Sequence, residues 1–169
     1  MSLWESWDGR LSDRAISLLV SRRRRLVAGI VAHSGDSQWW LILGVLLWWR
    51  GADTWREAGV RMIVVTVLGG LISGLVKRVV RRPRPEGSAH LFYLQFDRHS
   101  FPSGHATRVA ALTVALGAMA PWWGALLLSL WGVAVGISRM ALSLHFASDI
   151  AAGMGLGVVL GAVLLLYWG

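Results

Sequence analysis

Long apolar stretches separated by short polar clusters dominate the chain. Five stretches reach or approach the length of a membrane span, at about residues 37–49, 60–76, 103–120, 122–137 and 148–168. A helix that crosses a bilayer needs about 20 mostly apolar residues. The pattern therefore predicts an all-α protein, a multi-pass transmembrane helix bundle with five spans, of which the first is short.

Residues 1–36 depart from this pattern and predict an amphipathic, interfacial N-terminal arm. Residues 22–25 are four consecutive arginines, which point around every face of a helix. An arginine at the bilayer centre costs several kcal/mol. We therefore expect an interfacial helix or bent hairpin that binds anionic lipids, followed by a transmembrane domain over residues 37–169. A sixth span within residues 11–33 is the alternative.

Small residues recur at one-turn spacing in two of the predicted spans. Gly153, Gly157 and Gly161 fall four apart, as do Ala106 and Ala110. Such faces let helices approach closely in lipid. We interpret them as packing surfaces that carry no chemistry.

The composition agrees with a membrane protein. The chain is 55% hydrophobic and 15% charged, whereas soluble domains are about 25% charged. A soluble globular protein and a disordered one are both excluded. The net charge of +8 favours contact with lipid headgroups or phosphate over nucleic acid, and the lack of cysteine excludes thiolate chemistry.

Three polar clusters interrupt the apolar chain, at residues 77–85, 102–105 and 138–149. With five spans, all three lie on the same side of the membrane as the N-terminal arm. That side holds all but three of the 17 Lys and Arg residues. Positive charge accumulates on the cytoplasmic side of membrane proteins, so we expect these clusters at the cytoplasmic face of the cell (inner) membrane.

The third cluster contains a histidine and a carboxylate one helical turn apart. His145 and Asp149 are i and i+4, so the carboxylate can accept a hydrogen bond from one ring nitrogen. This leaves the other nitrogen as a nucleophile. Arg139 comes just before, at the end of the fourth span. A structural His–Asp pair is the alternative.

The second cluster is typical of a helix N-terminus that binds an anion. Ser103 is a candidate N-cap, and Gly104 lets a ligand approach the backbone. His105 would lie in the first turn. Alone, this sequence would be an ordinary turn.

The first cluster supplies cations. Arginine binds phosphate oxygens in a bidentate manner, although the cluster alone could simply mark the membrane boundary. The chain has 16 arginines, and Lys77 is its single lysine. Because lysine occurs at this one position among so many arginines, we expect the compact ammonium group of Lys77 to have a specific role.

Together the clusters resemble the three-part signature of the type 2 phosphatidic acid phosphatase (PAP2) superfamily: K-x6-RP, PSGH and SR-x5-H-x3-D. Lys77 to Arg84-Pro85, Pro102 to His105, and Ser138-Arg139 to His145 and Asp149 match in residue type, spacing and order. The resemblance covers about residues 37–169. Many bacterial members have six spans, one more than we identify here.

The resemblance implies a metal-independent enzyme, without a cofactor, that hydrolyses a lipid phosphate. His145 would attack phosphorus and form a phosphohistidine, with Asp149 orienting it. His105 would protonate the leaving oxygen and then activate water. The implied phosphate ligands are Lys77, Arg84, Ser103, Gly104 and Arg139. Because Lys77 followed by six residues reaches Arg84, Arg82 is expected to face lipid phosphates at the membrane surface instead.

Several questions stay open at this level. The substrate could be phosphatidic acid, phosphatidylglycerol phosphate, a polyprenyl phosphate sugar, a polyprenyl pyrophosphate or a lipid A phosphate, and the polyprenyl pyrophosphate is the main alternative. A non-catalytic lipid transporter or scaffold is the second alternative. A haloperoxidase with the same signature would be larger and soluble. The sequence does not fix the oligomeric state.

We interpret His33, His90 and His99 as loop residues, and residues 91–96 as a segment that either dips into the membrane or packs on the bundle.

Overall fold

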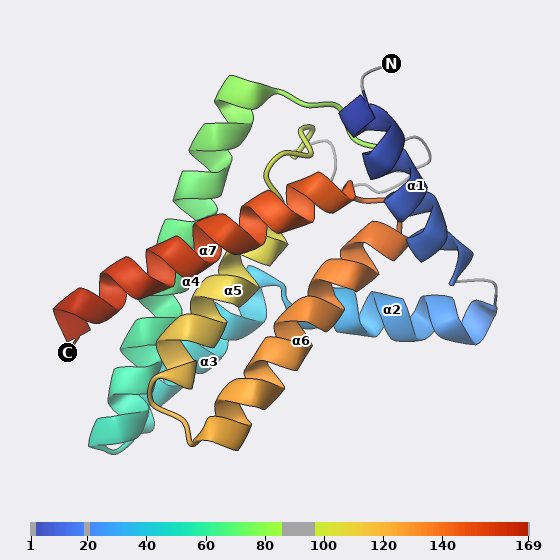
Figure 1. The fold of residues 1–169 in the computed structure, drawn as a ribbon. Coiled ribbons are helices and arrows are strands. Elements are labelled where there is room, and N and C mark those ends of the chain that lie inside the picture. The colour runs from blue at the N-terminus through green and yellow to red at the C-terminus, as the bar shows by residue number, and fades with distance from the viewer. Residues whose placement is uncertain (1–2, 19–20, 86–96, 169) are drawn as a thin grey trace.

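The computed structural model describes residues 3–18, 21–85 and 97–168. All regular structure in these residues is helical (Figure 1). The helices are α1 (Leu3–Ser17), α2 (Arg22–Ser34), α3 (Ser37–Arg50), α4 (Asp53–Val80), α5 (Gly104–Gly117), α6 (Trp122–Ala141) and α7 (Ala147–Trp168). The predicted all-α class is confirmed, and the five predicted apolar stretches correspond to α3 through α7.

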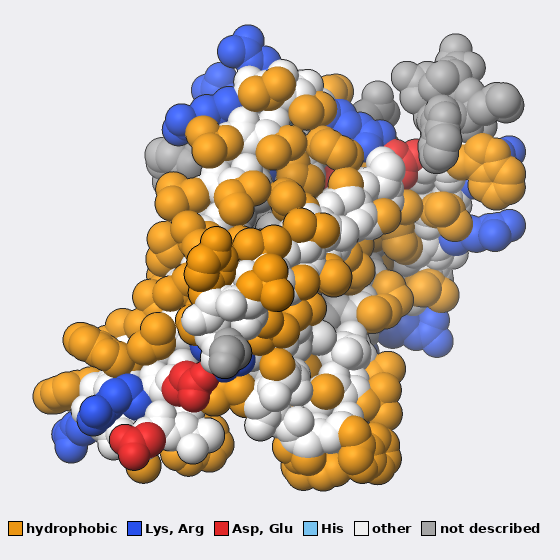
Figure 2. All heavy atoms as spheres, turned by 60° about the vertical axis from the view of Figure 1, so that its left-hand side comes forward, with side chains coloured by type: hydrophobic (Ala, Val, Ile, Leu, Met, Phe, Trp, Pro, Cys, Tyr) orange, Lys and Arg blue, Asp and Glu red, His pale blue; other side chains and the backbone are white. Residues whose placement is uncertain are grey.

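Three of these helices, α4, α6 and α7, are long and apolar enough to cross a membrane. Helices α3 and α5 have 14 residues each, which gives about 21 Å of helix against about 30 Å of hydrocarbon. Apolar side chains cover the middle of the face in Figure 2, and basic side chains lie at its upper end, its right edge and its lower left. The exterior of the bundle is therefore suited to lipid.

Helix α5 lies at the centre of the bundle and packs against α4, α6 and α7. The predicted glycine face of α7 is confirmed, because a Cβ at Gly157 would lie 2.1 Å from the Thr107 carbonyl oxygen. This close packing places the N-terminal ends of α5 and α7 side by side. The Ser103 N–H donates to the Asp149 carbonyl oxygen at 3.0 Å.

The N-terminal arm contains two helices, α1 and α2, and both pack against α6 (Figure 1). The four arginines form the exposed first turn of α2, where Ser21 accepts a hydrogen bond from the Arg24 N–H at 3.2 Å. Asp8 in α1 and Asp36 after α2 both contact residues at the same end of the bundle.

Candidate active site

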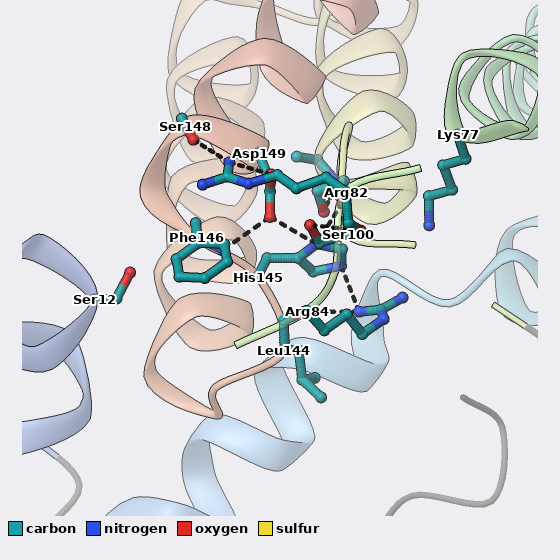
Figure 3. A network of polar contacts seen from close by, with 12 residues as sticks. Ser12, Lys77, Arg82, Arg84, Ser100, Leu144, His145, Phe146, Ser148 and Asp149 are labelled. Carbon is teal, nitrogen blue, oxygen red and sulfur yellow. Dashed lines mark hydrogen bonds and ion pairs between the residues drawn. The ribbon is translucent and has the colours of Figure 1, made fainter. Parts of the chain in front are cut away.

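The three polar clusters meet where α4 and α6 end and α5 and α7 begin. His145 lies in the connection from α6 to α7 and is 1% exposed. Its Nδ1 lies 2.9 Å from the carbonyl oxygen of Ser100, which can only accept a hydrogen bond. Nδ1 therefore carries the proton, and the lone pair is on Nε2. Nε2 lies 3.3 Å from Nη1 of Arg84 (Figure 3).

Asp149 adopts a different contact from the predicted one. Its Oδ2 lies 3.7 Å from His145 Nδ1, too far for a hydrogen bond, and accepts instead from the Phe146 N–H at 2.9 Å. The helix start competes for the carboxylate, because the first N–H groups of α7 need acceptors. The Ser100 carbonyl fixes the histidine tautomer, and Asp149 adds a nearby negative charge.

Arg82 does not face the membrane surface, so that expectation was wrong. Its Nη1 donates to Asp149 Oδ1 at 2.8 Å and to Ser148 Oγ at 2.6 Å. Its Nη2 pairs with Asp8 Oδ2 at 2.6 Å, and its guanidinium lies over the Phe146 ring. Asp8 also accepts from the Ser148 N–H at 2.9 Å. Burial would raise the pKa of Asp8, but its contacts with Ser148 and Arg82 lower it, so a charged network joins α1 to Asp149.

The expected phosphate-binding cations converge on a carboxylate that the sequence did not single out. Lys77 Nζ donates to Asp97 Oδ1 at 2.6 Å, and Arg84 Nη2 lies 2.9 Å from Asp97 Oδ2 without an aligned hydrogen bond. Burial would raise the pKa of Asp97, but the charges of Lys77 and Arg84 lower it. An anionic group thus lies between the two cations, next to His145.

The cations also keep the nucleophile neutral. Burial, together with Arg84, Arg139 and Lys77, lowers the pKa of His145 to about 4. Arg139, in the last turn of α6, is 2% exposed. A neutral imidazole whose Nε2 lone pair faces fixed cations can attack an anionic phosphoryl group at neutral pH.

The second cluster begins α5 in the predicted manner. Ser103 is the N-cap, and its side chain accepts from the Ala106 N–H at 3.4 Å. Gly104 packs closely on α4, since a Cβ there would lie 3.3 Å from Ser73 Oγ. His105 follows in the first turn, with Nε2 2.6 Å from Asp36 Oδ1.

The structure thus brings all eight predicted site residues to one end of the bundle. The residues that sequence analysis missed are Asp8, Asp36, Asp97 and the carbonyl of Ser100. The expectation that His33 is a loop residue was wrong, because it lies in α2 and its Nδ1 is 2.9 Å from Asp36. His99 lies in a segment without regular structure, whereas His90 and residues 91–96 lie outside the described residues. Within the described ranges, no group of three His, Cys, Asp or Glu residues could hold a metal ion.

Comparison with known proteins places this arrangement in a family. Residues 58–169 match the family model of the PAP2 superfamily. A lipid A 1-phosphatase of Rhizobium etli is 26% identical over 147 residues, which cover 73% of this chain and 62% of that protein. A decaprenylphosphoryl-5-phosphoribose phosphatase of Mycobacterium tuberculosis is 34% identical over 128 residues, which cover 73% and 68%. The chain therefore spans about three fifths of the length of the lipid A phosphatase.

The fold is also that of a solved structure. The crystal structure of a transmembrane PAP2-type phosphatidylglycerolphosphate phosphatase from Bacillus subtilis superimposes with a TM-score of 0.82 at 24% identity. The superposition covers 99% of this chain and 87% of that protein. The N-terminal helices α1 and α2 are thus included in the shared fold.

Proposed function

Because this chain belongs to the PAP2 superfamily, we propose that it is a membrane enzyme that hydrolyses the terminal phosphate of a lipid through a phosphohistidine. The observation that supports this proposal most strongly is the geometry of His145. Its tautomer is set by the Ser100 carbonyl, and its Nε2 lies 3.3 Å from Arg84. A structural His–Asp pair or a scaffold gives no reason for a buried, neutral imidazole to face three cations.

In the first step, Nε2 of His145 attacks phosphorus. The bond from phosphorus to the lipid oxygen breaks, and His105 gives its proton to that oxygen. In the second step, water attacks the phosphoryl group, His105 takes a proton from the water, and the P–N bond breaks to release phosphate. Phosphoryl transfer needs mainly positioning and charge stabilisation, which the chain's own side chains supply without a metal or cofactor.

Lys77, Arg84 and Arg139, with the start of α5 at Ser103 and Gly104, would hold the non-bridging oxygens. The Asp97 carboxylate now lies against two of these cations. A bound phosphate would take its place, because both anions need the same donors. Competition of this kind favours substrates whose phosphate carries two negative charges over singly charged diesters.

The substrate class is a lipid with a terminal phosphate, held either as a monoester or at the end of a pyrophosphate. The named relatives are a lipid A 1-phosphatase and a decaprenylphosphoryl-5-phosphoribose phosphatase. The second name favours a polyprenyl phosphate sugar as one candidate and a polyprenyl pyrophosphate as the alternative. Phosphatidylglycerol phosphate is a third, from the Bacillus subtilis relatives.

The test is phosphate release by the purified protein in detergent, with EDTA, from a panel of these lipids. We expect activity on at least one lipid of the panel, inhibition by orthovanadate as a transition-state mimic, and no activity in His145→Ala. Abolition by EDTA with rescue by one divalent ion would contradict the metal-independent mechanism. A wild-type protein inactive on the whole panel would contradict the proposed function.

We propose that the site faces the cytoplasm from the inner membrane, because the basic residues of the first cluster gather where α4 ends beside it. The chain has no cysteine, so single cysteines can report the orientation. Ser17 is exposed on α1 near the site end, and Thr54 is exposed at the opposite end of α4. In intact cells an impermeant thiol reagent should label Thr54→Cys but not Ser17→Cys. The reverse pattern would place the site outside.

A further inference from the structure

Asp36 lies in the turn between α2 and α3, outside residues 58–169 that match the family. Its Oδ1 lies 2.6 Å from Nε2 of His105. We propose that Asp36 is the positioning residue of His105, which fixes the ring and stabilises its protonated form during proton transfer. The proposal rests on the proposed function, because it assigns a partner to the proton donor of that reaction.

The turn that carries Asp36 is held in place by three other helices. Arg108, one turn after His105 in α5, donates to the Gly35 carbonyl oxygen at 2.8 Å. Trp40 in α3 donates to the Ser34 carbonyl oxygen, and Trp131 in α6 donates to the Ser34 hydroxyl, both at 2.9 Å. The carboxylate is therefore placed by long-range contacts rather than by a mobile loop. Arg108 ties it to the same helix that carries His105.

Asp36 also does not cap its own helix with its side chain. It is the N-cap residue of α3, a position where aspartate normally accepts a hydrogen bond from the first helical N–H groups. Here its side chain makes no capping hydrogen bond and contacts His105 and His33 instead. A residue that departs from its local preference to meet a distant side chain indicates selection for that contact.

The carboxylate is charged under all working conditions. Burial would raise the pKa of Asp36, but its hydrogen bonds with His105 and His33 lower it to about 2. An anion at Nε2 can only accept, so Nε2 of His105 carries a proton and transfer to the substrate falls to Nδ1. Burial and the cations Arg139 and Arg108 disfavour a positive His105, and the contact with Asp36 opposes them in part.

The protons then balance over the two steps. In the first, the Nδ1 proton of His105 passes to the lipid oxygen as the P–O bond breaks and the bond to His145 forms. In the second, a water proton returns to Nδ1 as the water oxygen bonds to phosphorus and the P–N bond breaks. Throughout, the Nε2 proton remains hydrogen-bonded to Asp36. In this scheme Asp36 acts only through His105.

The test compares Asp36→Asn with wild type, with Asp13→Asn as a control on an exposed aspartate of α1. We expect kcat for a lipid phosphate to fall about 10- to 100-fold with KM within about threefold, a part of the 10²–10⁴ that general acid catalysis supplies. With 4-nitrophenyl phosphate, whose leaving group needs little protonation, the pre-steady-state burst rate should stay within about threefold of wild type. Asp13→Asn should match wild type in both assays.

A purely structural role is separated by a double-mutant cycle. If Asp36 acts through His105, Asp36→Asn should cause less than about twofold further loss in a His105→Ala background. An equal loss in both backgrounds, an equal loss in the nitrophenyl burst, or an unchanged lipid kcat in the single variant would each overturn the proposal. A wild-type protein without lipid phosphatase activity would instead overturn the proposed function, so the two failures are distinguishable.

Discussion

Replacing Arg82 by alanine removes the cation that links the N-terminal arm to Asp149. Its guanidinium binds Asp149 Oδ1 at 2.8 Å and Asp8 Oδ2 at 2.6 Å. The side chain of Asp149 is fully buried, and that of Asp8 is 9% exposed. In the variant two buried carboxylates lose their common partner, and Asp149 is free to turn away from the Phe146 N–H.

The magnitude follows from burial. Removing one partner of a fully buried ion pair costs about 3–5 kcal/mol. The Arg82 side chain is 26% exposed, so water screens part of this, and we expect about 2 kcal/mol of lost stability. At about 3 °C per kcal/mol for a chain of this length, Tm should fall by about 6 °C. Misplacing the histidine–carboxylate pair by even about 1 Å should lower kcat by about 10- to 100-fold.

The assay is steady-state hydrolysis of the best lipid phosphate, together with thermal unfolding in the same detergent. Arg81→Ala is the matched control, because Arg81 is exposed and its side chain donates within α4, to the Arg78 carbonyl oxygen. Arg82→Lys should be intermediate, since one ammonium cannot bridge two carboxylates as a guanidinium does. The reasoning is refuted if Arg82→Ala keeps wild-type kcat and Tm, or if it changes only KM and the effect disappears with salt.

Arg84→Ala should lower kcat about 10²-fold or more, as expected for loss of a transition-state donor, and a loss below tenfold in steady-state kinetics would argue against its role. The acid limb of the kcat/KM profile should lie near pH 4 once the profile is corrected for ionisation of the substrate phosphate. Burial lowers the pKa of His145 to about 4, so this histidine stays neutral above that pH. An acid limb near pH 6.5, the ordinary value for histidine, would contradict the buried site. Gly157→Ala should reduce the yield of folded, active protein, because its Cβ would lie 2.1 Å from the Thr107 carbonyl oxygen, whereas Gly155→Ala meets open space. Equal yields of the two variants would show that close packing of α5 and α7 is not required.

Sequence analysis predicted the parts of this molecule that depend on local pattern. The apolar stretches became helices, Ser103 became an N-cap, and the glycines of α7 became a packing face. The convergence of the three clusters followed from counting spans, because each cluster lies at a helix end on the same side.

The residues that were missed reach the site through packing between distant segments. Asp8 meets Ser148 across 140 positions, and Asp36 meets His105 across 69. Neither has a local signal, since each is a single aspartate in a polar stretch. The contact of Arg82 with Asp149 was missed for the same reason: motif spacing identifies Arg84 but says nothing about its neighbour.

These contacts change the picture of the N-terminal arm. Its composition predicted a membrane-surface anchor, and the exposed arginines at the start of α2 agree with that. Through Asp36, however, the arm contacts His105, and through Asp8 it contacts Ser148 and Arg82 beside Asp149. The arm therefore contributes residues to the site, which composition alone could not indicate.

The covalent intermediate is the central claim, and trapping it is the most direct measurement. The purified His105→Ala variant, which should form the phosphoenzyme with 4-nitrophenyl phosphate but hydrolyse it slowly, is quenched under alkaline conditions and digested for mass spectrometry. A covalent mechanism predicts an acid-labile, base-stable phosphoryl group on the peptide that contains His145, absent after His145→Ala. Continued turnover without any phosphorylated peptide, or a phosphoryl group on a different residue, would contradict it.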